Sequence, residues 1–319
     1  MSAAPVPIVS FDRDTARQAL RVYMTRTGLA LNQVAELMGR AHHSLRQFIS
    51  TGRYGDGEGR FTAKAVMDFI ESHPPAAISA PGRLYETECT RAIRGMVTYV
   101  ASGRWGILYG PAGSQKSFSL ECIAAESAQL AEPGSIYVEC SPKLTPSSLL
   151  RRIATALAAP YAQSREGILQ SVLFTVRRRR SPLALLIDEA QHLYRVVDTL
   201  ETVRDLGDKS RGKIGILVSG NEDVLRLFEP RRGVYFEQWR SRIEQKTVRL
   251  TGLTGPECRQ IVAAELGVLK PEAVEAILDK PVVDPETRRH YYSARRLFHA
   301  IRDFREMREK TLKTSVDSL

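Results

Sequence analysis

Residues 107–117 read ILYGPAGSQKS, an apolar run that passes into a glycine-rich turn ending in lysine and serine. The apolar run is typical of a buried strand, and a helical pattern over residues 116–130 begins directly after it. A turn of this kind between a strand and a helix presents backbone N–H groups and a helix N-terminus to phosphate oxygens. The stretch predicts a phosphate-binding loop at the edge of a sheet that is flanked by helices.

Within this loop we expect Lys116 to neutralise the β- and γ-phosphates of a nucleotide and Ser117 to place its hydroxyl on Mg²⁺. The usual pattern is GxxxxGK[ST], and Gln115 stands where that pattern has its second glycine. We expect this departure to affect hydrolysis and nucleotide affinity. The residues expected to contact the nucleotide are Gly110, Pro111, Ala112, Gly113, Ser114, Gln115, Lys116, Ser117, Phe118 and Asp188.

A second element supports the loop. Residues 183–192 read LALLIDEAQH, in which a buried strand pattern is followed by two acids. The strand's carboxyl end brings Asp188 and Glu189 to the sheet edge where the phosphates are expected. Asp188 is expected to hold Mg²⁺ through its water shell, and Glu189 to polarise the attacking water. An ordinary strand followed by a helix-starting acid pair does not explain why loop and acids occur together in this order.

Apolar runs and helical patterns alternate through the middle of the chain. Strands are expected at 107–109, 135–140, 183–187 and 214–218. Helices are expected at 116–130, 145–158, 165–179 and 193–207. This alternation is typical of a parallel sheet with helices on both faces. Beyond about residue 250 we expect no more of these sheet strands, but three helices at 255–266, 271–279 and 293–312.

The N-terminal part has a different pattern. Residues 31–50 read LNQVAELMGRAHHSLRQFIS, two short helical faces separated by Gly39, which can adopt the positive φ of a tight turn. The spacing resembles the helix-turn-helix of phage repressors, whose second helix meets DNA. The resemblance implies that four side chains face DNA: His42, His43, Arg46 and Gln47. The alternative is a helical hairpin that makes only protein contacts.

Composition bears on partners and compartment. Lys and Arg exceed Asp and Glu by 46 − 36 = 10, which favours a polyanionic partner such as nucleic acid or an anionic membrane surface. No apolar run approaches the ~18–20 residues of a membrane helix, and the N-terminus lacks a signal-peptide pattern, so we expect no membrane association and a cytoplasmic protein. The scattered cysteines are expected to be reduced and buried: Cys89, Cys122, Cys140 and Cys258.

Three further polar residues follow the loop and the acids in order. Asn221 comes after the strand at 214–218, Arg242 lies in a Ser-Arg-Ile box, and Arg295 opens the last helix. This order resembles the AAA+ ATPases. The resemblance implies that Asn221 is sensor 1, that Arg242 is the finger that completes a neighbouring subunit's site, and that Arg295, rather than Arg296, is sensor 2. With Glu189, these form the expected catalytic set.

The resemblance leaves two choices open. Arg240 lies two residues before Arg242 and is the alternative finger. Tyr292 stands where the sensor 2 motif has a glycine, which leaves the choice between Arg295 and Arg296 open.

Within the AAA+ group, the helix-turn-helix, the Asp-Glu-Ala-Gln-His box and the short C-terminal helices resemble the transposon helper ATPases that include phage Mu transposition protein B. The fold implied is α/β, an AAA+ P-loop parallel sheet with an N-terminal all-α domain and a helical lid. The expected segments are a helix-turn-helix domain (10–71), a linker (72–83), a nucleotide-binding core (84–250) and the lid (251–319).

The resemblance also implies an activity and partners. The protein would hydrolyse ATP with Mg²⁺ in a slow, DNA-stimulated reaction. It would assemble as a homo-oligomeric ring or helical filament on double-stranded DNA and deliver that DNA to a transposase, with hydrolysis driving release. Residues expected to follow DNA in the central channel are Lys143, Thr145, Arg151, Arg152, Lys209 and Arg211.

Two alternatives stay open. The first is a DNA-binding regulator in which the loop is a scaffold that does not hydrolyse nucleotide, and Gln115 favours it. The second keeps the ATPase but assigns it to replication loading or secretion, because similar acid boxes occur in those ATPases.

Overall fold

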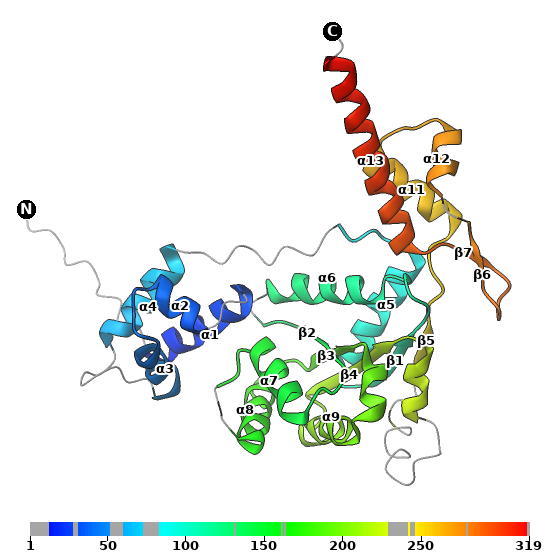
Figure 1. Cartoon of the computed structure of the whole chain (residues 1–319). Coiled ribbons are helices and arrows are strands. Elements are labelled where there is room, and N and C mark those ends of the chain that lie inside the picture. Colours follow the sequence, from blue (N-terminus) through cyan, green and yellow to red (C-terminus); the bar gives the residue numbers. More distant parts are fainter. Residues whose placement is uncertain are drawn as a thin grey trace, which may run out of the picture. The chain divides into compact units, whose positions relative to one another are not determined.

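The computed structural model describes residues 13–27, 31–51, 60–72, 83–130, 132–160, 162, 164–228, 242, 246–278 and 280–317. The chain forms two compact units: residues 1–79 with 145–180, and residues 80–144 with 181–319. Figure 1 labels the elements of both. Most of the predicted linker lies outside the described residues. Arg240 also lies outside them.

The first unit is helical. Its elements are α1 (Arg13–Thr27), α2 (Leu31–Leu37), α3 (His42–Thr51), α4 (Arg60–Ser72), α7 (Pro146–Ala156) and α8 (Arg165–Arg177). Leu20 and Phe48 are fully buried between α1 and α3, and the rings of Tyr23 and Phe69 meet edge to face at 5.3 Å. The predicted apolar faces of residues 31–50 are confirmed as core: Val34, Ala35, Leu45, Phe48 and Ile49 are buried.

The turn between α2 and α3 depends on Gly39. Its φ of 60° lies in the left-handed region, as the sequence predicted. Its N–H donates to Glu36 O at 2.9 Å and the next N–H, that of Arg40, donates to Ala35 O at 2.8 Å. These bonds satisfy carbonyls at the end of α2 and let the chain turn directly into α3.

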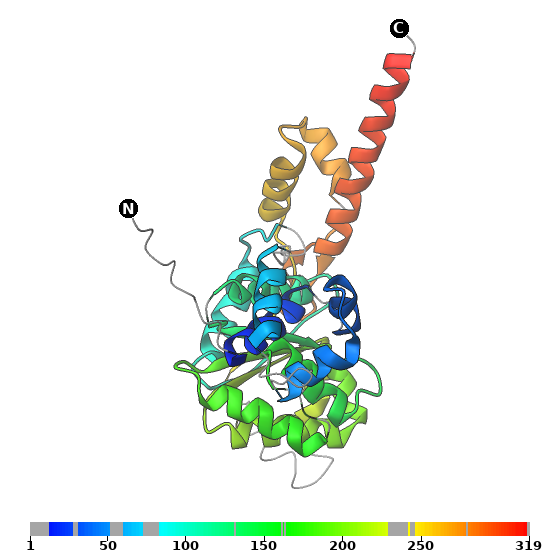
Figure 2. The same cartoon turned by 90° about the vertical axis from the view of Figure 1, so that its left-hand side faces the viewer.

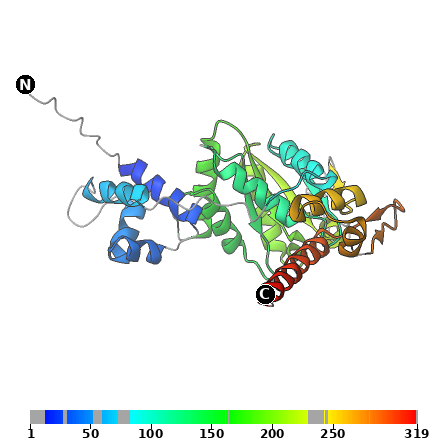
Figure 3. The same cartoon turned by 90° about the horizontal axis from the view of Figure 1, so that it is seen from above.

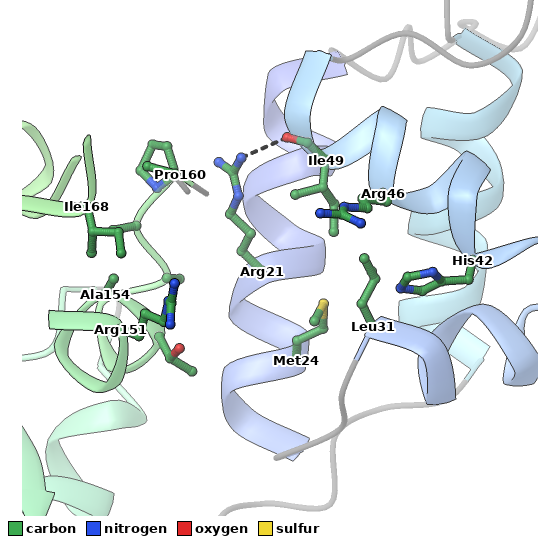
Figure 4. Close-up of a pocket in the computed structure, with 14 residues that line it drawn as sticks. Arg21, Met24, Leu31, His42, Arg46, Ile49, Arg151, Ala154, Pro160 and Ile168 are labelled. Atoms are coloured by element: carbon green, nitrogen blue, oxygen red, sulfur yellow. Dashed lines mark hydrogen bonds between the residues drawn. The ribbon is translucent and has the colours of Figure 1, made fainter. Parts of the chain in front are cut away.

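Arginines of α1 hold the C-terminal end of α3. The Ile49 carbonyl accepts from Arg17 Nε at 3.1 Å and from a terminal nitrogen of Arg21 at 2.8 Å, the bond dashed in Figure 4. Burial lowers the pKa of Arg21 to about 10, so the side chain is still a cation at neutral pH. Cations at this end offset the negative end of the helix dipole and fix α3 against α1.

The second unit is built on a parallel sheet of β1 (Trp105–Tyr109), β2 (Ser135–Glu139), β3 (Leu183–Asp188), β4 (Ile214–Gly220) and β5 (Thr247–Arg249). The strand order is β2-β3-β4-β1-β5, and all neighbouring pairs are parallel. The parallel sheet predicted from the sequence is confirmed. Because β4 lies between β1 and β3, the residues that follow these three strands meet at one edge.

Helices of this unit cover both faces of the sheet (Figure 1). Residues of α5 (Glu88–Val100) and α6 (Lys116–Ala128) form one core cluster with Leu108, Leu186 and Leu217. On the other face, α9 (Val197–Lys209) passes so near the sheet at Gly207 that a Cβ there would lie 2.2 Å from the Trp105 ring. The helix predicted at 193–207 is corrected: a 3-10 helix, η1 (Ala190–Arg195), precedes α9, because Val196 has a non-helical backbone.

The C-terminal segment contains α11 (Gly255–Leu266), α12 (Pro271–Ile277) and α13 (Ala294–Asp317). These helices share a core that includes Ile261, Leu297 and Ile301, and α13 runs on past α11 and α12 (Figure 2). A 3-10 helix of the same unit, η2 (Glu222–Phe228), follows β4.

One expectation for this segment was wrong, because strands do occur after residue 250. An antiparallel hairpin of β6 (Val282–Val283) and β7 (His290–Tyr291) follows α12 in the sequence and projects outward at the right-hand side of Figure 3. Two-residue strands are too short to give an alternating pattern. A residue that is distant in the sequence stabilises the hairpin: the buried Asp284 carboxylate accepts a hydrogen bond from Arg249 of β5 at 2.6 Å. Bonds from Thr287 and Arg249 lower the pKa of Asp284 to about 2.

Two expectations from composition can be compared with the structure. All four cysteines are free and buried, as predicted. Among the described residues, every helix falls short of the length and apolar character needed to cross a bilayer.

Candidate nucleotide-binding site

The predicted loop follows β1 and is closed from above by the start of α13. Gly113 has a φ of +84°, and a Cβ there would lie 2.2 Å from Ser293 Oγ. Its carbonyl accepts from the Ala294 N–H at 2.9 Å. Only glycine fits this position without displacing the helix, so the second glycine of Gly110-Pro-Ala-Gly113 positions the first turn of α13 over the loop.

Gln115, the departure from the usual pattern, has a left-handed backbone with a φ of 65°. Glycine adopts this conformation readily, whereas a side chain there is disfavoured. The Gln115 side chain is buried, and its Oε1 accepts a bond of 3.1 Å from Thr87 Oγ1. Thr87 caps α5. The chain therefore keeps the expected loop conformation and ties it to α5 through a side chain that glycine lacks.

Lys116 is folded onto its own loop. Its Nζ donates to Gly110 O at 2.7 Å, Pro111 O at 2.9 Å and Ser114 Oγ at 3.1 Å. Burial lowers the pKa of the ammonium group, while the nearby Asp188 and Glu189 act in the opposite sense. The three acceptors are neutral, so phosphate oxygens would compete for the ammonium with a full opposite charge.

Asp188 ends β3 and is almost fully buried. Its Oδ2 accepts from the Tyr137 hydroxyl at 3.1 Å, and burial followed by the Asp188 charge raises the pKa of Tyr137. Its Oδ1 has no hydrogen-bond partner among the described residues. A buried carboxylate oxygen without a partner is costly, and a hydrated Mg²⁺ would satisfy it. The donor set of Asp188 and Ser117 fits the predicted metal.

Glu189 and Asn221 stand at the neighbouring strand ends. Glu189 has a left-handed backbone, with a φ of 52°, and its carboxylate accepts from Gln191 Nε2. Asn221 follows β4, and its Oδ1 accepts from the Asp223 N–H at 3.0 Å. That bond orients the Asn221 amide and leaves its nitrogen as a donor.

Residues of the loop, Glu189 and Asn221 line one cavity of about 720 Å³, whereas Asp188 is not among its lining residues. The predicted residues that line it are Ala112, Gly113, Gln115, Lys116, Ser117, Phe118, Glu189, Asn221 and Arg295. Gly110, Pro111 and Ser114 lie behind it, bonded to Lys116. Arg295 lines the cavity and its neighbour Arg296 is not among the lining residues, which favours Arg295 for the role implied by the resemblance.

The cavity also contains residues that the sequence analysis missed: Arg83, Gln191, Glu265, Phe298 and His299. Phe298 and His299 lie three and four positions after Arg295 on α13, so helical spacing could have found them. Gln191 follows the same predicted strand as the two acids, so its place at this edge of the sheet could have been predicted in the same way. Arg83 and Glu265 are far apart in the sequence and carry no such signal.

Arg242 lies elsewhere. Its guanidinium pairs with Asp208 at the end of α9 and stands 5.3 Å over the centre of the Trp105 ring. These residues line a separate hollow of about 330 Å³ with Arg104. Arg242 is thus away from the cavity of its own chain, at the opposite end of β1. The role of a finger for another subunit stays a prediction.

The residues predicted to meet DNA are mostly exposed. On α3, His42, His43 and Arg46 are exposed and Gln47 is half-buried. In the same unit, His42, Arg46 and Arg151 line a cavity of about 410 Å³, drawn in Figure 4.

The other predicted DNA contacts are also at the surface: Lys143, Thr145, Arg152, Lys209 and Arg211 are exposed. Thr145 is also the cap of α7, and Lys209 pairs with Asp205 at 2.8 Å. Lys143 and Arg211 occupy left-handed turn positions.

Comparison with solved structures finds weak similarity over much of the chain. The ORC1 protein of Aeropyrum pernix in complex with DNA has 18% identity and a TM-score of 0.44 over 67% of this chain and 58% of that chain. Cdc6p of Pyrobaculum aerophilum has 18% identity and a TM-score of 0.46 over 65% and 57%. The replication initiator DnaA bound to AMPPCP and single-stranded DNA has 14% identity and a TM-score of 0.45 over 73% and 68%. The chain therefore spans less than two thirds of the length of the first two.

No curated protein matches the sequence. A family model described as AAA domain matches residues 101–228, which run from the end of α5 through the loop and the two acids to η2. The N-terminal helices and α11–α13 lie outside this match, and the resemblance to transposon helpers stays a prediction. Residues 101–228 supply the loop residues, Glu189 and Asn221 that line the cavity, and also Asp188, and they thus match an AAA domain.

Proposed function

We propose that this protein is a DNA-binding ATPase that assembles on duplex DNA when ATP is bound and releases it after hydrolysis. The observation that carries the proposal is the cavity of about 720 Å³, in which Lys116, Glu189 and Asn221 come from three adjacent strand ends. Asp188 adds a buried oxygen, Oδ1, that has no hydrogen-bond partner in the described part of the chain. A lysine, two acids and an amide at one sheet edge are the groups that hydrolysis of a nucleoside triphosphate requires.

In the proposed reaction, the water oxygen attacks the γ-phosphorus, and the bond from that phosphorus to the β–γ bridging oxygen breaks, giving ADP and phosphate. Glu189 accepts the proton that the water loses. Lys116 stabilises charge on the β- and γ-phosphates, and the Asn221 amide orients the water. Mg²⁺, held by Ser117 and by Asp188 through water, would neutralise phosphate charge.

Exposed cations support DNA as the partner. The net charge is +10, and α3 presents His42, His43 and Arg46 on its exposed side. Binding through phosphates predicts little sequence preference and a steep fall of affinity with salt, with a slope of about −0.9 for each phosphate neutralised. Assembly into a ring or filament, and a transposase as the client that receives the DNA, follow from the resemblance to transposon helpers. Replication loading is the competing client process.

Variants of the two groups that act on ATP test the activity. Glu189→Gln keeps the shape of the side chain and loses the base, so turnover should fall about 10²–10⁴-fold while ATP binding is retained. Lys116→Ala should lose both binding and turnover. ATP turnover is measured with and without duplex DNA. Unchanged turnover in Glu189→Gln would remove the role of Glu189, and a wild-type chain without turnover would support the scaffold alternative instead.

DNA binding is measured separately with ATP, with ADP and without nucleotide, at several salt concentrations. The expected result is tight binding with ATP only, weakening steeply with salt. Equal binding in all three states would contradict the switch. If a transposase is encoded beside the gene, adding it should give a joint complex on DNA only with ATP. A complex with a replicative helicase instead would reassign the client.

A further inference from the structure

The side chain of Gln191 lies between Glu189 and Gly220, the residue that precedes Asn221. The proposed reaction uses both Glu189 and Asn221. Gln191 is the second residue of η1, directly after the acids that end β3. Its Nε2 donates to Glu189 Oε2. The bond occupies one carboxylate oxygen of Glu189 and leaves the other oxygen for water.

The oxygen of the same amide, Oε1, is packed against Gly220 of β4. Gln191 Oε1 is buried and has no hydrogen-bond partner among the described residues. A Cβ on Gly220 would lie 2.2 Å from this oxygen, so the last residue of β4 leaves the space that the amide fills. Gly220 is followed directly by Asn221, which lines the cavity with Glu189 and Gln191.

The orientation of the amide follows from charge. Exchanging its nitrogen and oxygen would bring an oxygen onto the Glu189 carboxylate, with no proton between them. The amide therefore gives its N–H to Glu189, although leaving Oε1 unsatisfied costs free energy. An apolar side chain of the same length would fill the same space without that cost, so packing alone does not account for a glutamine here.

We infer that Gln191 is a positioning residue for Glu189: its amide N–H fixes the carboxylate, and Gly220 keeps the amide in place. The inference rests on the proposed function, in which Glu189 accepts a proton from the attacking water. Gln191 acts through Glu189, so its loss should lower kcat and leave the affinity for ATP unchanged, because the loop residues that bind phosphates are untouched.

The first test replaces the amide and keeps its length. Gln191→Met should lower kcat about 10–100-fold, since misplacing a reacting group by about 1 Å costs up to about 10²-fold. KM and the Kd for ATP should stay within about threefold of wild type, and Tm should not fall. Gln129→Met, at the exposed end of α6, is the matched control and should behave as wild type.

The second test uses the fit between Gln191 and Gly220. Gly220→Ala should lower kcat as Gln191→Met does, because its Cβ displaces the amide. In a Gln191→Ala background the space is open, so adding Gly220→Ala should change kcat less than twofold. Equal effects of Gly220→Ala in both backgrounds would overturn the role of Gly220 in holding the amide and, with it, the inference.

The third test is independent of turnover. The side-chain NH₂ resonances of Gln191, identified by their loss in Gln191→Met, should move in Glu189→Ala. Unmoved resonances would overturn the inference. So would wild-type kcat in Gln191→Met, while Glu189→Gln stays inactive and the proposed function stands. A wild-type chain that binds ATP without any turnover overturns both.

Discussion

The cavity beside the loop and the surface around Arg242 lie at opposite ends of the same strand, β1. At its carboxyl end, side chains from the ends of three strands and from α13 converge on one space of about 720 Å³. At its amino end, the contacts of Arg242 within the described part of the chain include an acid and an aromatic ring, Asp208 and Trp105.

The two regions differ in whether their charged groups already have partners. The cavity has cations at the loop and on α13, while Asp188 has an oxygen with no partner among the described residues. Arg242 already has a carboxylate partner, yet its side chain is still 40% exposed. The cavity is thus prepared for a ligand, whereas Arg242 must leave Asp208 before it can act on a phosphate. Because exposed ion pairs contribute about 1 kcal/mol or less, a phosphate of another subunit could displace Asp208.

The largest expected effect in this comparison comes from Arg242→Ala. If Arg242 completes a neighbour's site, turnover should fall about 10³-fold or more, as for other arginine fingers. Folding and ATP binding should survive, because the lost ion pair between Arg242 and Asp208 is exposed. Assembly on DNA with ATP should be lost. Turnover, ATP affinity and sedimentation with DNA check these three outcomes.

Two controls sharpen that result. Arg226, another exposed arginine paired with an aspartate, is the matched control, and Arg226→Ala should leave turnover unchanged. Mixing Arg242→Ala with Lys116→Ala should restore part of the activity, because mixed interfaces join an intact loop to an intact arginine. Full turnover by Arg242→Ala alone would move the role to Arg240.

A smaller effect is expected on the cavity side, from Arg295→Ala. Arg295 lines the cavity with Lys116, whereas Arg296 is not among its lining residues. Removing the cation should weaken ATP binding about tenfold, which corresponds to about 1.4 kcal/mol. Arg296→Ala should bind ATP as wild type does. Titration with a fluorescent ATP analogue compares the two, and the reverse ranking would exchange their roles.

The smallest effect is expected from Gln115→Gly. Glycine relieves a left-handed side-chain conformation that costs about 1–2 kcal/mol, but it loses the Thr87 bond of about 1 kcal/mol and gains chain entropy on unfolding. The free energy of unfolding should therefore change by about 1 kcal/mol or less. Thr87→Val loses this bond and also the side-chain cap of α5, so it should be destabilised by about 2 kcal/mol.

Urea unfolding measures both variants, with ATP affinity as the second readout. Retained ATP binding in Gln115→Gly would show that the loop backbone is sufficient for phosphate recognition. Loss of ATP binding would instead make the Gln115 amide part of the binding site, and the cavity would then depend on a side chain that the usual loop does not have.

The sequence by itself predicted the parallel sheet, the loop and the two acids. These features are local: a buried strand is read from consecutive apolar residues, and the loop that contains Lys116, the acid Asp188 and the amide Asn221 each come at or shortly after the end of such a strand. Because the carboxyl ends of parallel strands share one edge, their meeting follows from the strand pattern alone. The left-handed turn at Gly39 was predictable for the same reason, since one residue type sets it.

Tertiary structure alone decided the contacts between distant segments. The β6–β7 hairpin is held by Arg249 on Asp284, 35 residues away, and its short strands show no period. Thr87 meets Gln115, and Gly220 leaves room for Gln191, through side chains whose partners no spacing rule specifies. Arg242 was located by its motif, but its pairing with Asp208 depends on where α9 ends. Packing in three dimensions sets these contacts, and no local pattern encodes them.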